Sequence, residues 1–273
     1  MRIEADLSPA AALQNLTAAV REAGRLALGF FRLGAATSAD VKSKLGGSPV
    51  TEADLAADAL LKARLRPAFP EAGWLSEETA DDAERLARRA LIVVDPIDGT
   101  RGFVAGDSRW AVSAALVVDG RPIAGVVHAP ALDETFAAAR GAGAALNGER
   151  IAMAPLPRAE PFRAAGPRPV LQAMALSLGV AIDIVPRVPS LAYRLSLAAG
   201  GAVALASAAE NSHDWDIAAA DLILEEAGGR LTDASGERLL YNRSQTRRDA
   251  LLAAPEPLAP GLLEAFRAAS GAR

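Results

Sequence analysis

Two carboxylates, a proline, a glycine and a hydroxyl group follow one another in the segment Asp95-Pro96-Ile97-Asp98-Gly99-Thr100. Hard cations such as Mg²⁺ prefer carboxylate and carbonyl oxygens, and two nearby aspartates on a turn can offer both kinds to one or two ions. The structural alternative is a turn whose aspartates accept hydrogen bonds from backbone amides. The spacing does not match the calcium-binding helix–loop–helix, which needs further acidic positions. The segment therefore predicts either a cation site or an acid-capped turn.

Three other segments carry acidic side chains that could join this site. Glu77 follows a serine and precedes a second glutamate, and adjacent acids in front of a helix also complement the helix dipole. Asp54 follows Thr51 at the spacing of a capping box, which stabilises a helix start without any chemistry. Asp216 closes a segment that begins at His213 and also fits an N-cap. Each segment alone has a structural explanation.

The candidate residues must be positioned by both helices and strands. Apolar residues recur at helical spacing over residues 10–33, and a second helix follows the capping box over residues 51–69. A solvated helix is expected at residues 81–90. The β-branched run at residues 91–94 predicts a buried strand that ends at Asp95. Loops at strand ends commonly carry function, so the acidic segment lies where chemistry is expected.

Strands and helices alternate along the rest of the chain. Strand-like segments at residues 111–118 and 122–128 are joined by Asp119-Gly120, a strong hairpin signal, and a further strand is expected at residues 134–139. The later expected elements are a proline-rich crossover at 154–189, helices at 190–200 and 216–227, a glycine cap at Gly228-Gly229, and a last strand at 251–253. The length favours two halves, residues 1–155 with most of the candidate acids and residues 156–273 completing the site.

Composition narrows the classes of function. The 273 residues are 51% hydrophobic and 23% charged, which is typical of a globular protein. The formal net charge of −4 offers no basic stripe for nucleic acid, and the absence of cysteine excludes thiol nucleophiles and cysteine metal sites. Residues 1–9 lack the layout of a secretory signal, and the longest uncharged stretch, 195–209, is too short to cross a bilayer. We therefore expect a cytoplasmic protein that contacts neither nucleic acid nor membrane.

Four motifs together are similar to those of the inositol monophosphatase-like superfamily of Mg²⁺-dependent, lithium-sensitive phosphomonoesterases. In chain order they are Ser48-Pro49-Val50-Thr51-Glu52-Ala53-Asp54, Ser76-Glu77-Glu78, Asp95-Pro96-Ile97-Asp98-Gly99-Thr100, and Trp215-Asp216-Ile217-Ala218-Ala219-Ala220 with Glu226-Ala227-Gly228-Gly229. They run in the family's order over nearly the whole chain. The resemblance implies an α/β fold, a layered α-β-α-β-α sandwich with the metal cluster between its halves.

The resemblance also implies a role for each candidate residue. The implied ligands of two or three Mg²⁺ ions, or of Mn²⁺ as the alternative, are Glu77, Asp95, Asp98, Asp216 and the carbonyl of Ile97. Glu77 and Thr100, the latter oriented by Asp54, would activate the attacking water, while the amides of Gly99 and Thr100 hold the phosphate. The expected partner is a small phosphorylated metabolite, and the family is compatible with a homodimer.

The residues after Thr100 indicate a branch of this superfamily. Thr100-Arg101-Gly102-Phe103 resembles the bisphosphate nucleotidases, in which a basic residue and a glycine follow the threonine. Ala209 stands where the inositol branch usually places a sugar-contacting glutamate, although Glu210 is adjacent. We therefore expect removal of the 3'-phosphate from adenosine 3',5'-bisphosphate. The alternatives are hydrolysis of inositol 1-phosphate or histidinol phosphate, and a non-catalytic regulator that binds a partner.

Overall fold

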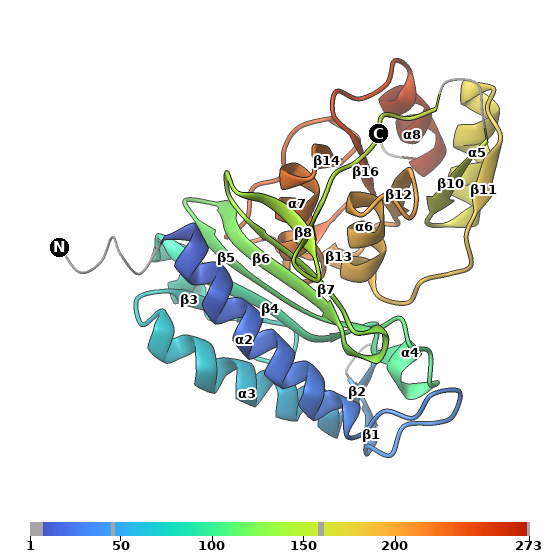
Figure 1. Ribbon diagram of the computed structural model, residues 1–273. Coiled ribbons are helices and arrows are strands. Elements are labelled where there is room, and N and C mark those ends of the chain that lie inside the picture. Colours follow the sequence, from blue (N-terminus) through green and yellow to red (C-terminus); the bar gives the residue numbers. More distant parts are fainter. Residues whose placement is uncertain (1–7, 45–46, 158–160, 272–273) are drawn as a thin grey trace.

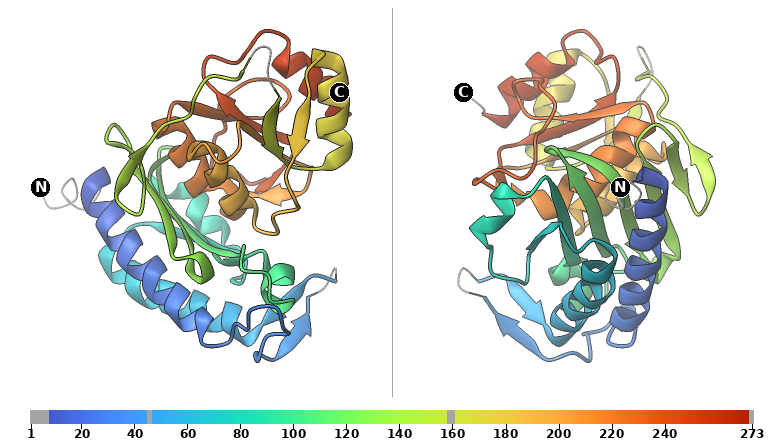
Figure 2. Two further views of the ribbon diagram at one scale, coloured as in Figure 1. Left: turned by 45° about the vertical axis from the view of Figure 1, so that its right-hand side comes forward. Right: turned by 90° about the vertical axis from the view of Figure 1, so that its left-hand side faces the viewer.

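The computed structural model describes residues 8–44, 47–157 and 161–271. Five layers stack on one another in the order α-β-α-β-α (Figure 1). A seven-stranded sheet and a five-stranded sheet form the two β layers, and a pair of helices fills the space between them, as the turned views in Figure 2 also show. This is the layered sandwich predicted from the four motifs. Residues 1–7, in the segment where we expect no secretory signal, lie outside the described part of the chain.

Three pairs of helices make the α layers. α2 and α3 cover the outer face of the seven-stranded sheet, α6 and α7 lie between the sheets, and α5 and α8 cover the outer face of the five-stranded sheet. The helices are α2 (Pro9–Leu28), α3 (Glu52–Ala68), α4 (Thr100–Val104), α5 (Arg168–Leu178), α6 (Leu191–Ala199), α7 (Asp214–Glu226) and α8 (Leu262–Ser270), with 3₁₀ turns η1 (Ala83–Ala87) and η2 (Pro130–Leu132).

The seven-stranded sheet is antiparallel except for its first pair. Its strands, in spatial order, are β3 (Gly73–Ser76), β4 (Ala90–Asp98), β5 (Ala111–Val118), β6 (Arg121–Ala129), β7 (Glu134–Ala139), β8 (Gly143–Leu146) and β9 (Glu149–Ile151). Only β3 and β4 run parallel. Helices pack on both faces of β4, which explains why its sequence is a continuous apolar run rather than an alternating one.

The five-stranded sheet is mixed and built from the C-terminal part of the chain. Its strands, in spatial order, are β11 (Ile182–Ile184), β10 (Phe162–Ala165), β12 (Leu205–Ala208), β16 (Leu251–Pro255) and β14 (Gly229–Thr232). Two short pairs lie apart from both sheets, namely β1 (Val41–Ser43) with β2 (Pro49–Thr51), and β13 (Ser212–His213) with β15 (Arg247–Arg248).

The acidic segment is part of a strand, so the prediction that the strand ends at Asp95 is wrong. Asp95 pairs with Ser113 of β5, Asp98 pairs with Ala111, and the register shifts between them. Proline has no amide hydrogen to give to the ladder, so the two residues between the aspartates form a bulge. The bulge bends the C-terminal end of β4, where both aspartates lie.

Several predicted helix boundaries are wrong for tertiary reasons. α2 ends at Leu28 rather than near residue 33, and the ring of Phe31 packs 5.6 Å from that of Trp110. The end of α3, by contrast, agrees with the prediction to within one residue, since the helix ends at Ala68 and Pro67 lies in its last turn. Only residues 83–87 of the segment 81–90 are helical, as a 3₁₀ turn, because the buried side chain of Arg85 is bound to Asp81 and to the chain at residues 242–243.

The hairpin prediction is confirmed, whereas the C-terminal part holds more structure than expected. Asp119 and Gly120 adopt φ of 51° and 77°, the left-handed pair that a two-residue hairpin turn requires. The proposed crossover at residues 154–189 contains β10, α5 and β11, and the helix α8 follows the last strand. Short elements in a proline-rich stretch carry too few periodic residues to be recognised locally.

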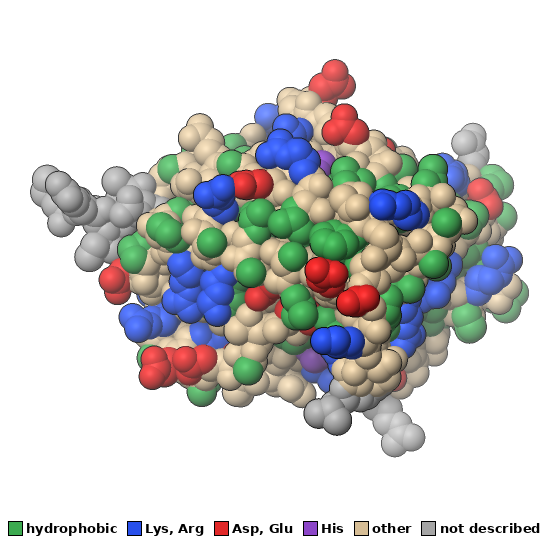
Figure 3. Space-filling model, turned by 90° about the horizontal axis from the view of Figure 1, so that it is seen from below, with side chains coloured by type: hydrophobic (Ala, Val, Ile, Leu, Met, Phe, Trp, Pro, Cys, Tyr) green, Lys and Arg blue, Asp and Glu red, His purple; other side chains and the backbone are tan. Residues whose placement is uncertain are grey.

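Apolar side chains fill each space between the layers. One cluster lies between α2, α3 and the first sheet, a second around α6 and α7, and a third beneath α5 and α8. Among the described residues, no helix is both long and apolar enough to cross a membrane. The face seen in Figure 3 carries acidic and basic side chains interspersed with isolated hydrophobic groups. The core is therefore divided into three apolar clusters that lie between the layers, and function is expected where polar groups interrupt them.

Candidate active site

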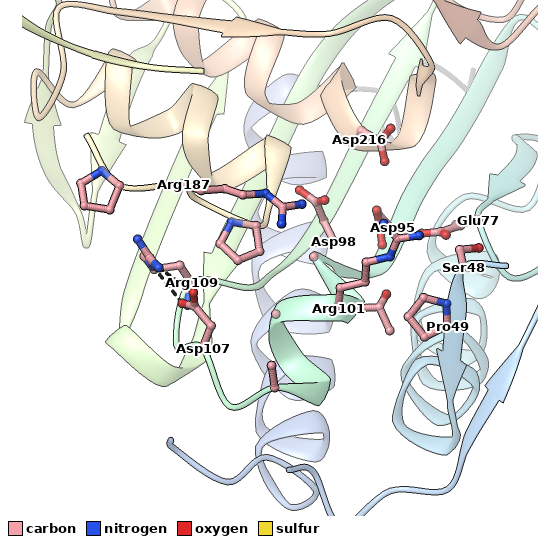
Figure 4. Close-up of a pocket in the computed structure, with 16 residues that line it drawn as sticks. Ser48, Pro49, Glu77, Asp95, Asp98, Arg101, Asp107, Arg109, Arg187 and Asp216 are labelled. Carbon is pink, nitrogen blue, oxygen red and sulfur yellow. Dashed lines mark hydrogen bonds and ion pairs between the residues drawn. The ribbon is translucent and has the colours of Figure 1, made fainter. Parts of the chain in front are cut away.

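Three carboxylates converge between the two sheets. Asp95 and Asp98 lie at the end of β4, and Asp216 lies in the first turn of α7. One oxygen of each residue lies within 4.8 Å of the others, and Figure 4 shows the three side chains around one hollow. Asp95 and Asp98 are only 1% and 7% exposed. The structure thus brings together two aspartates close in sequence and a third from the other end of the chain.

Asp95 presents an oxygen without a protein partner. Its Oδ1 accepts a hydrogen bond from the amide of Ile97 at 3.1 Å, which holds the bulge in shape. Its Oδ2 is buried and accepts no hydrogen bond from the described residues. A buried carboxylate oxygen is costly to leave unpaired. The donor set of this cluster, all carboxylate oxygen, is the one that a hard divalent cation prefers, so the residues present fit Mg²⁺.

Asp98 and Asp216 accept hydrogen bonds from residues of the C-terminal half. Asp98 Oδ2 accepts hydrogen bonds from Ser190 Oγ and from the amide of Ala192, both at 2.6 Å. Asp216 Oδ2 accepts one from the amide of His213 at 2.6 Å, as predicted for a residue at a helix start. Each aspartate therefore has a fixed orientation and keeps its other oxygen for the cluster.

Burial and mutual repulsion shift the protonation of these acids. Burial raises the pKa values of Asp95 and Asp216 well above the ordinary value for aspartate, and repulsion from neighbouring carboxylates is the second-largest cause. Loss of solvent raises the pKa of Asp98 to about 6, although its hydrogen bonds to Ser190 and Ala192 oppose the shift. Two charges 4 to 5 Å apart repel by about 3–4 kcal/mol at an effective dielectric near 20. A divalent cation would remove this repulsion.

Glu77 lies at the same hollow but is bound to a lysine. Lys44 Nζ lies 2.8 Å from Oε1 of Glu77 and 2.8 Å from Oε1 of Glu78. Glu78 is the more buried partner, with 4% of its side chain exposed against 24% for Glu77. Loss of solvent raises the pKa of Glu78 to about 7. No sequence pattern predicted a role for Lys44, because a lysine in a polar segment gives no local sign of its partners.

Asp54 serves the helix cap and Thr100 at the same time. Its Oδ2 accepts hydrogen bonds from the amide of Thr51 at 2.7 Å and from the Thr51 hydroxyl at 2.5 Å, which confirms the capping box. The hydroxyl of Thr100 lies 3.2 Å from Asp54 Oδ1 and 3.0 Å from the carbonyl oxygen of Ile97. The structural and the functional interpretation of Asp54 are therefore compatible, since each uses a different oxygen.

A pocket of about 560 Å³ opens over these side chains (Figure 4). Its lining includes the predicted residues Glu77, Asp95, Asp98, Gly99, Thr100 and Asp216. Three arginines also line it, Arg101 on α4, Arg109 before β5 and Arg187 before α6. The sequence analysis singled out only the first of these. Arg109 and Arg187 stand beside no recognisable motif, and only the fold brings them to the acids.

Comparisons with known proteins agree with this site. The family model described as "Inositol monophosphatase family" matches residues 10–270. Histidinol-phosphatase of Mycobacterium tuberculosis is 38% identical over 202 residues, which cover 69% of this chain and 75% of that protein. The 3'(2'),5'-bisphosphate nucleotidase CysQ of Aggregatibacter actinomycetemcomitans is 29% identical over 250 residues, 86% of this chain and 88% of that protein. The names of these relatives differ, so the comparisons alone favour no single substrate.

Solved structures share the whole fold. The crystal structure of the extragenic suppressor protein suhB from Bartonella henselae superposes with a TM-score of 0.79 at 27% identity, and the match covers 94% of this chain and 98% of that chain. The match of the family model over almost the entire chain and the acidic cluster of Asp95, Asp98 and Asp216 lead to one conclusion. The chain belongs to the inositol monophosphatase family and is a metal-dependent phosphomonoesterase.

Proposed function

We propose that this phosphatase removes the 3'-phosphate from a nucleoside 3',5'-bisphosphate such as adenosine 3',5'-bisphosphate. The observation that carries the proposal is the charge of the pocket wall. Outside the predicted metal ligands, the lining holds three arginines and one acidic residue, Asp107. Such a wall attracts a leaving group that is itself anionic. The sequence relationship to the nucleotidase CysQ supports the same substrate class.

The proposed mechanism assigns a task to each residue that the sequence predicted. Mg²⁺, held by Glu77, Asp95, Asp98, Asp216 and the carbonyl of Ile97, would lower the pKa of the attacking water and neutralise charge on the phosphate. Asp54 Oδ1 accepts a hydrogen bond from the hydroxyl of Thr100, and as the Thr100 oxygen takes a proton from the attacking water, its own proton passes to Asp54. Gly99 and Thr100 remain the predicted amide donors to the phosphate. Mn²⁺ stays an alternative to Mg²⁺.

Histidinol phosphate is the second candidate because the relative with 38% identity carries the name histidinol-phosphatase. Its leaving group bears an ammonium group, which requires a carboxylate partner. Asp107, the acidic lining residue outside the predicted ligands, already accepts two hydrogen bonds from the guanidinium of Arg109, at 2.8 and 2.6 Å. The pocket is therefore better suited to an anion than to a cation.

Inositol 1-phosphate is disfavoured by the position of Glu210. Glu210 is adjacent to Ala209, which stands where the inositol branch usually places its sugar-contacting glutamate. Glu210 is exposed and does not belong to the lining of the described pocket. A neutral polyol offers the arginines of the wall hydroxyl oxygens but no negative charge to pair with.

Phosphate release from the three esters, with and without Mg²⁺, tests the proposal. The ratio kcat/KM compares the stabilisation of each transition state, so the three values rank the substrates directly. We expect the bisphosphate to have the highest value and every activity to require Mg²⁺. Preference for histidinol phosphate or inositol 1-phosphate would keep the mechanism and reject the substrate. Absence of turnover with all three would favour a role in binding a partner.

A further inference from the structure

Arg187 and Arg101 approach the carboxylate cluster from opposite walls of the pocket. Arg187 lies in the segment between β11 and α6, and Arg101 lies on α4, so the two come from different halves of the sandwich. Figure 4 shows both guanidinium groups directed toward the acidic side chains. Within residues 8–44, 47–157 and 161–271, neither side chain forms an ion pair or a hydrogen bond. Both arginines thus keep all their donors for a ligand.

Arg109 in the same pocket differs from them. Its Nε and one terminal nitrogen donate to the two carboxylate oxygens of Asp107, and its charge is thereby compensated. Arg109 provides an internal comparison, because it is also an arginine of this pocket but two of its guanidinium nitrogens already donate to Asp107.

We propose that Arg187, together with Arg101, binds the anionic group of the substrate that is not hydrolysed. This inference rests on the proposed function and names the residues that recognise the second phosphate. The scissile phosphate is assigned to the metal cluster and to Gly99 and Thr100, which leaves the arginines for another group. A guanidinium offers two parallel donors that match phosphate oxygens. A hollow of about 560 Å³ lies in the range that holds a nucleotide-sized ligand.

The segment that carries Arg187 is held at a defined distance from the reacting groups. A Cβ added to Gly102 would lie 2.7 Å from the Pro189 side chain, and one added to Gly99 would lie 2.9 Å from the amide nitrogen of Ser190. The same segment continues into Ser190, whose hydroxyl binds Asp98 at 2.6 Å. Arg187 therefore lies three residues before a contact with Asp98, and its segment packs directly on α4. This packing fixes the spacing between the two phosphates that the pocket accepts.

The test compares adenosine 3',5'-bisphosphate with adenosine 3'-monophosphate, which has the same scissile bond and lacks the second phosphate. In the wild-type holoenzyme we expect a higher kcat/KM for the bisphosphate. Arg187→Met removes a charged hydrogen-bonding group, so this preference should fall by roughly 10- to 100-fold, mainly through KM. Arg187→Lys should restore part of the preference for the bisphosphate, because lysine keeps the positive charge but lacks the two parallel N–H donors of the guanidinium group. Thermal unfolding of each variant checks that the fold is intact.

A matched control removes one negative and one positive charge from the same wall, so that the net charge of the wall does not change. In the double variant Asp107→Asn with Arg109→Gln, the compensated pair disappears, and the preference for the bisphosphate should stay as in the wild type. An equal loss of kcat/KM for both esters in Arg187→Met would leave the preference unchanged and would show that Arg187 holds the scissile phosphate. Unchanged kcat/KM values for both esters would show that it binds neither phosphate. Either result overturns the inference.

A second ester pair separates this inference from the proposed nucleotide. If adenosine 3',5'-bisphosphate is not hydrolysed, fructose 1,6-bisphosphate and fructose 1-phosphate provide the same comparison with a sugar. A preference for the bisphosphate that depends on Arg187 would then support the second-anion site and reject the nucleotide. Failure of the variant to change the preference in both pairs, or the lack of turnover with every ester, would reject the second-anion site itself.

Discussion

The hydroxyl of Ser190 donates to Asp98 Oδ2 over 2.6 Å, a contact between the start of α6 and the end of β4. The same hydroxyl oxygen accepts a hydrogen bond from the amide of Tyr193 at 3.0 Å, so that it caps α6 and orients the aspartate at once. One side chain thus connects the helix layer between the sheets to the acidic cluster. The geometry of the cluster depends on this contact as well as on β4.

Ser190→Ala should weaken the binding of Mg²⁺ or Mn²⁺. Loss of a group that orients a metal ligand typically lowers metal affinity by about 10- to 100-fold, and loss of the cap costs about 1 kcal/mol of stability. Isothermal titration calorimetry measures the affinity. Ser196→Ala is the control, because that hydroxyl is also buried on α6 but donates to the carbonyl of Ala192 at 2.8 Å. Equal affinities in the two variants would contradict an orienting role for Ser190.

Asp95→Asn should abolish activity without unfolding the protein. We expect kcat/KM to fall by more than about 100-fold, the upper range for merely losing a partner of a metal ligand. Metal-free protein should be at least as stable as the wild type, because asparagine relieves the repulsion among the buried acids. Phosphate release and thermal unfolding with and without Mg²⁺ test both points. Asp183→Asn, at an exposed position, is the control, and a large drop in metal-free stability would instead make Asp95 a structural residue.

Thr100→Val and Thr100→Ser distinguish the contribution of the Thr100 hydroxyl to catalysis from that of its methyl group. Valine has no group to place between Asp54 and the carbonyl of Ile97, so kcat should fall by roughly 10²- to 10⁴-fold. Serine keeps the hydroxyl and should stay within about tenfold of the wild type. Single-turnover rates at saturating substrate measure the rate of phosphate-ester hydrolysis on the enzyme. If both variants lose the same activity, the methyl group rather than the hydroxyl is what matters.

Gly99→Ala should destabilise the protein more than Gly141→Ala. Both glycines have positive φ, of 92° and 79°, so alanine costs about 1–2 kcal/mol of backbone strain at either position. At Gly99 the new Cβ would also lie 2.9 Å from the amide nitrogen of Ser190, whereas nothing lies within 4 Å at Gly141. Urea unfolding should therefore show an extra loss of about 1 kcal/mol or more for Gly99→Ala. Equal losses would mean that α4 and the Ser190 segment separate easily.

The pH dependence of stability should include a contribution from Asp221. Tyr241 Oη donates to its Oδ2 at 2.8 Å, and loss of solvent raises the pKa of Asp221 to about 6. The folded state then holds the proton more tightly than the unfolded chain. The stability from this group is present at low pH and is lost as pH rises from about 4 to about 6.

Asp221→Asn stays neutral and can still accept the hydrogen bond of Tyr241. Its stability relative to the wild type should therefore increase by about 2 kcal/mol between pH 4 and pH 7. Urea unfolding of both metal-free proteins at the two pH values measures this difference, because the metal-site acids contribute equally and cancel. A difference that is the same at both pH values would contradict the raised pKa.

The four motifs identified the acids of the site only jointly, through their resemblance to a family, because each acidic segment alone also fits a helix cap or a turn. Thr51 and Asp54 cap a helix, and the acidic segment follows a buried β-branched run, so their types and spacing are visible without any tertiary information. The same local rules predicted the Asp119-Gly120 hairpin and the helices before and after the cluster. They could not predict how far β4 continues, since pairing with β5 decides that.

The sequence by itself determined the family, the layered fold and the carboxylates that meet at the site. Only the tertiary structure decided what surrounds them, namely Lys44 on Glu77, Ser190 on Asp98, and Arg187 across the pocket from Arg101. Lysine, serine and arginine occur at many surface positions, so their type and spacing indicate no partner. Their partners are distant in sequence, and the packing of α6 against the end of β4 brings them together. The surroundings of the carboxylates therefore depend on contacts that no local pattern records.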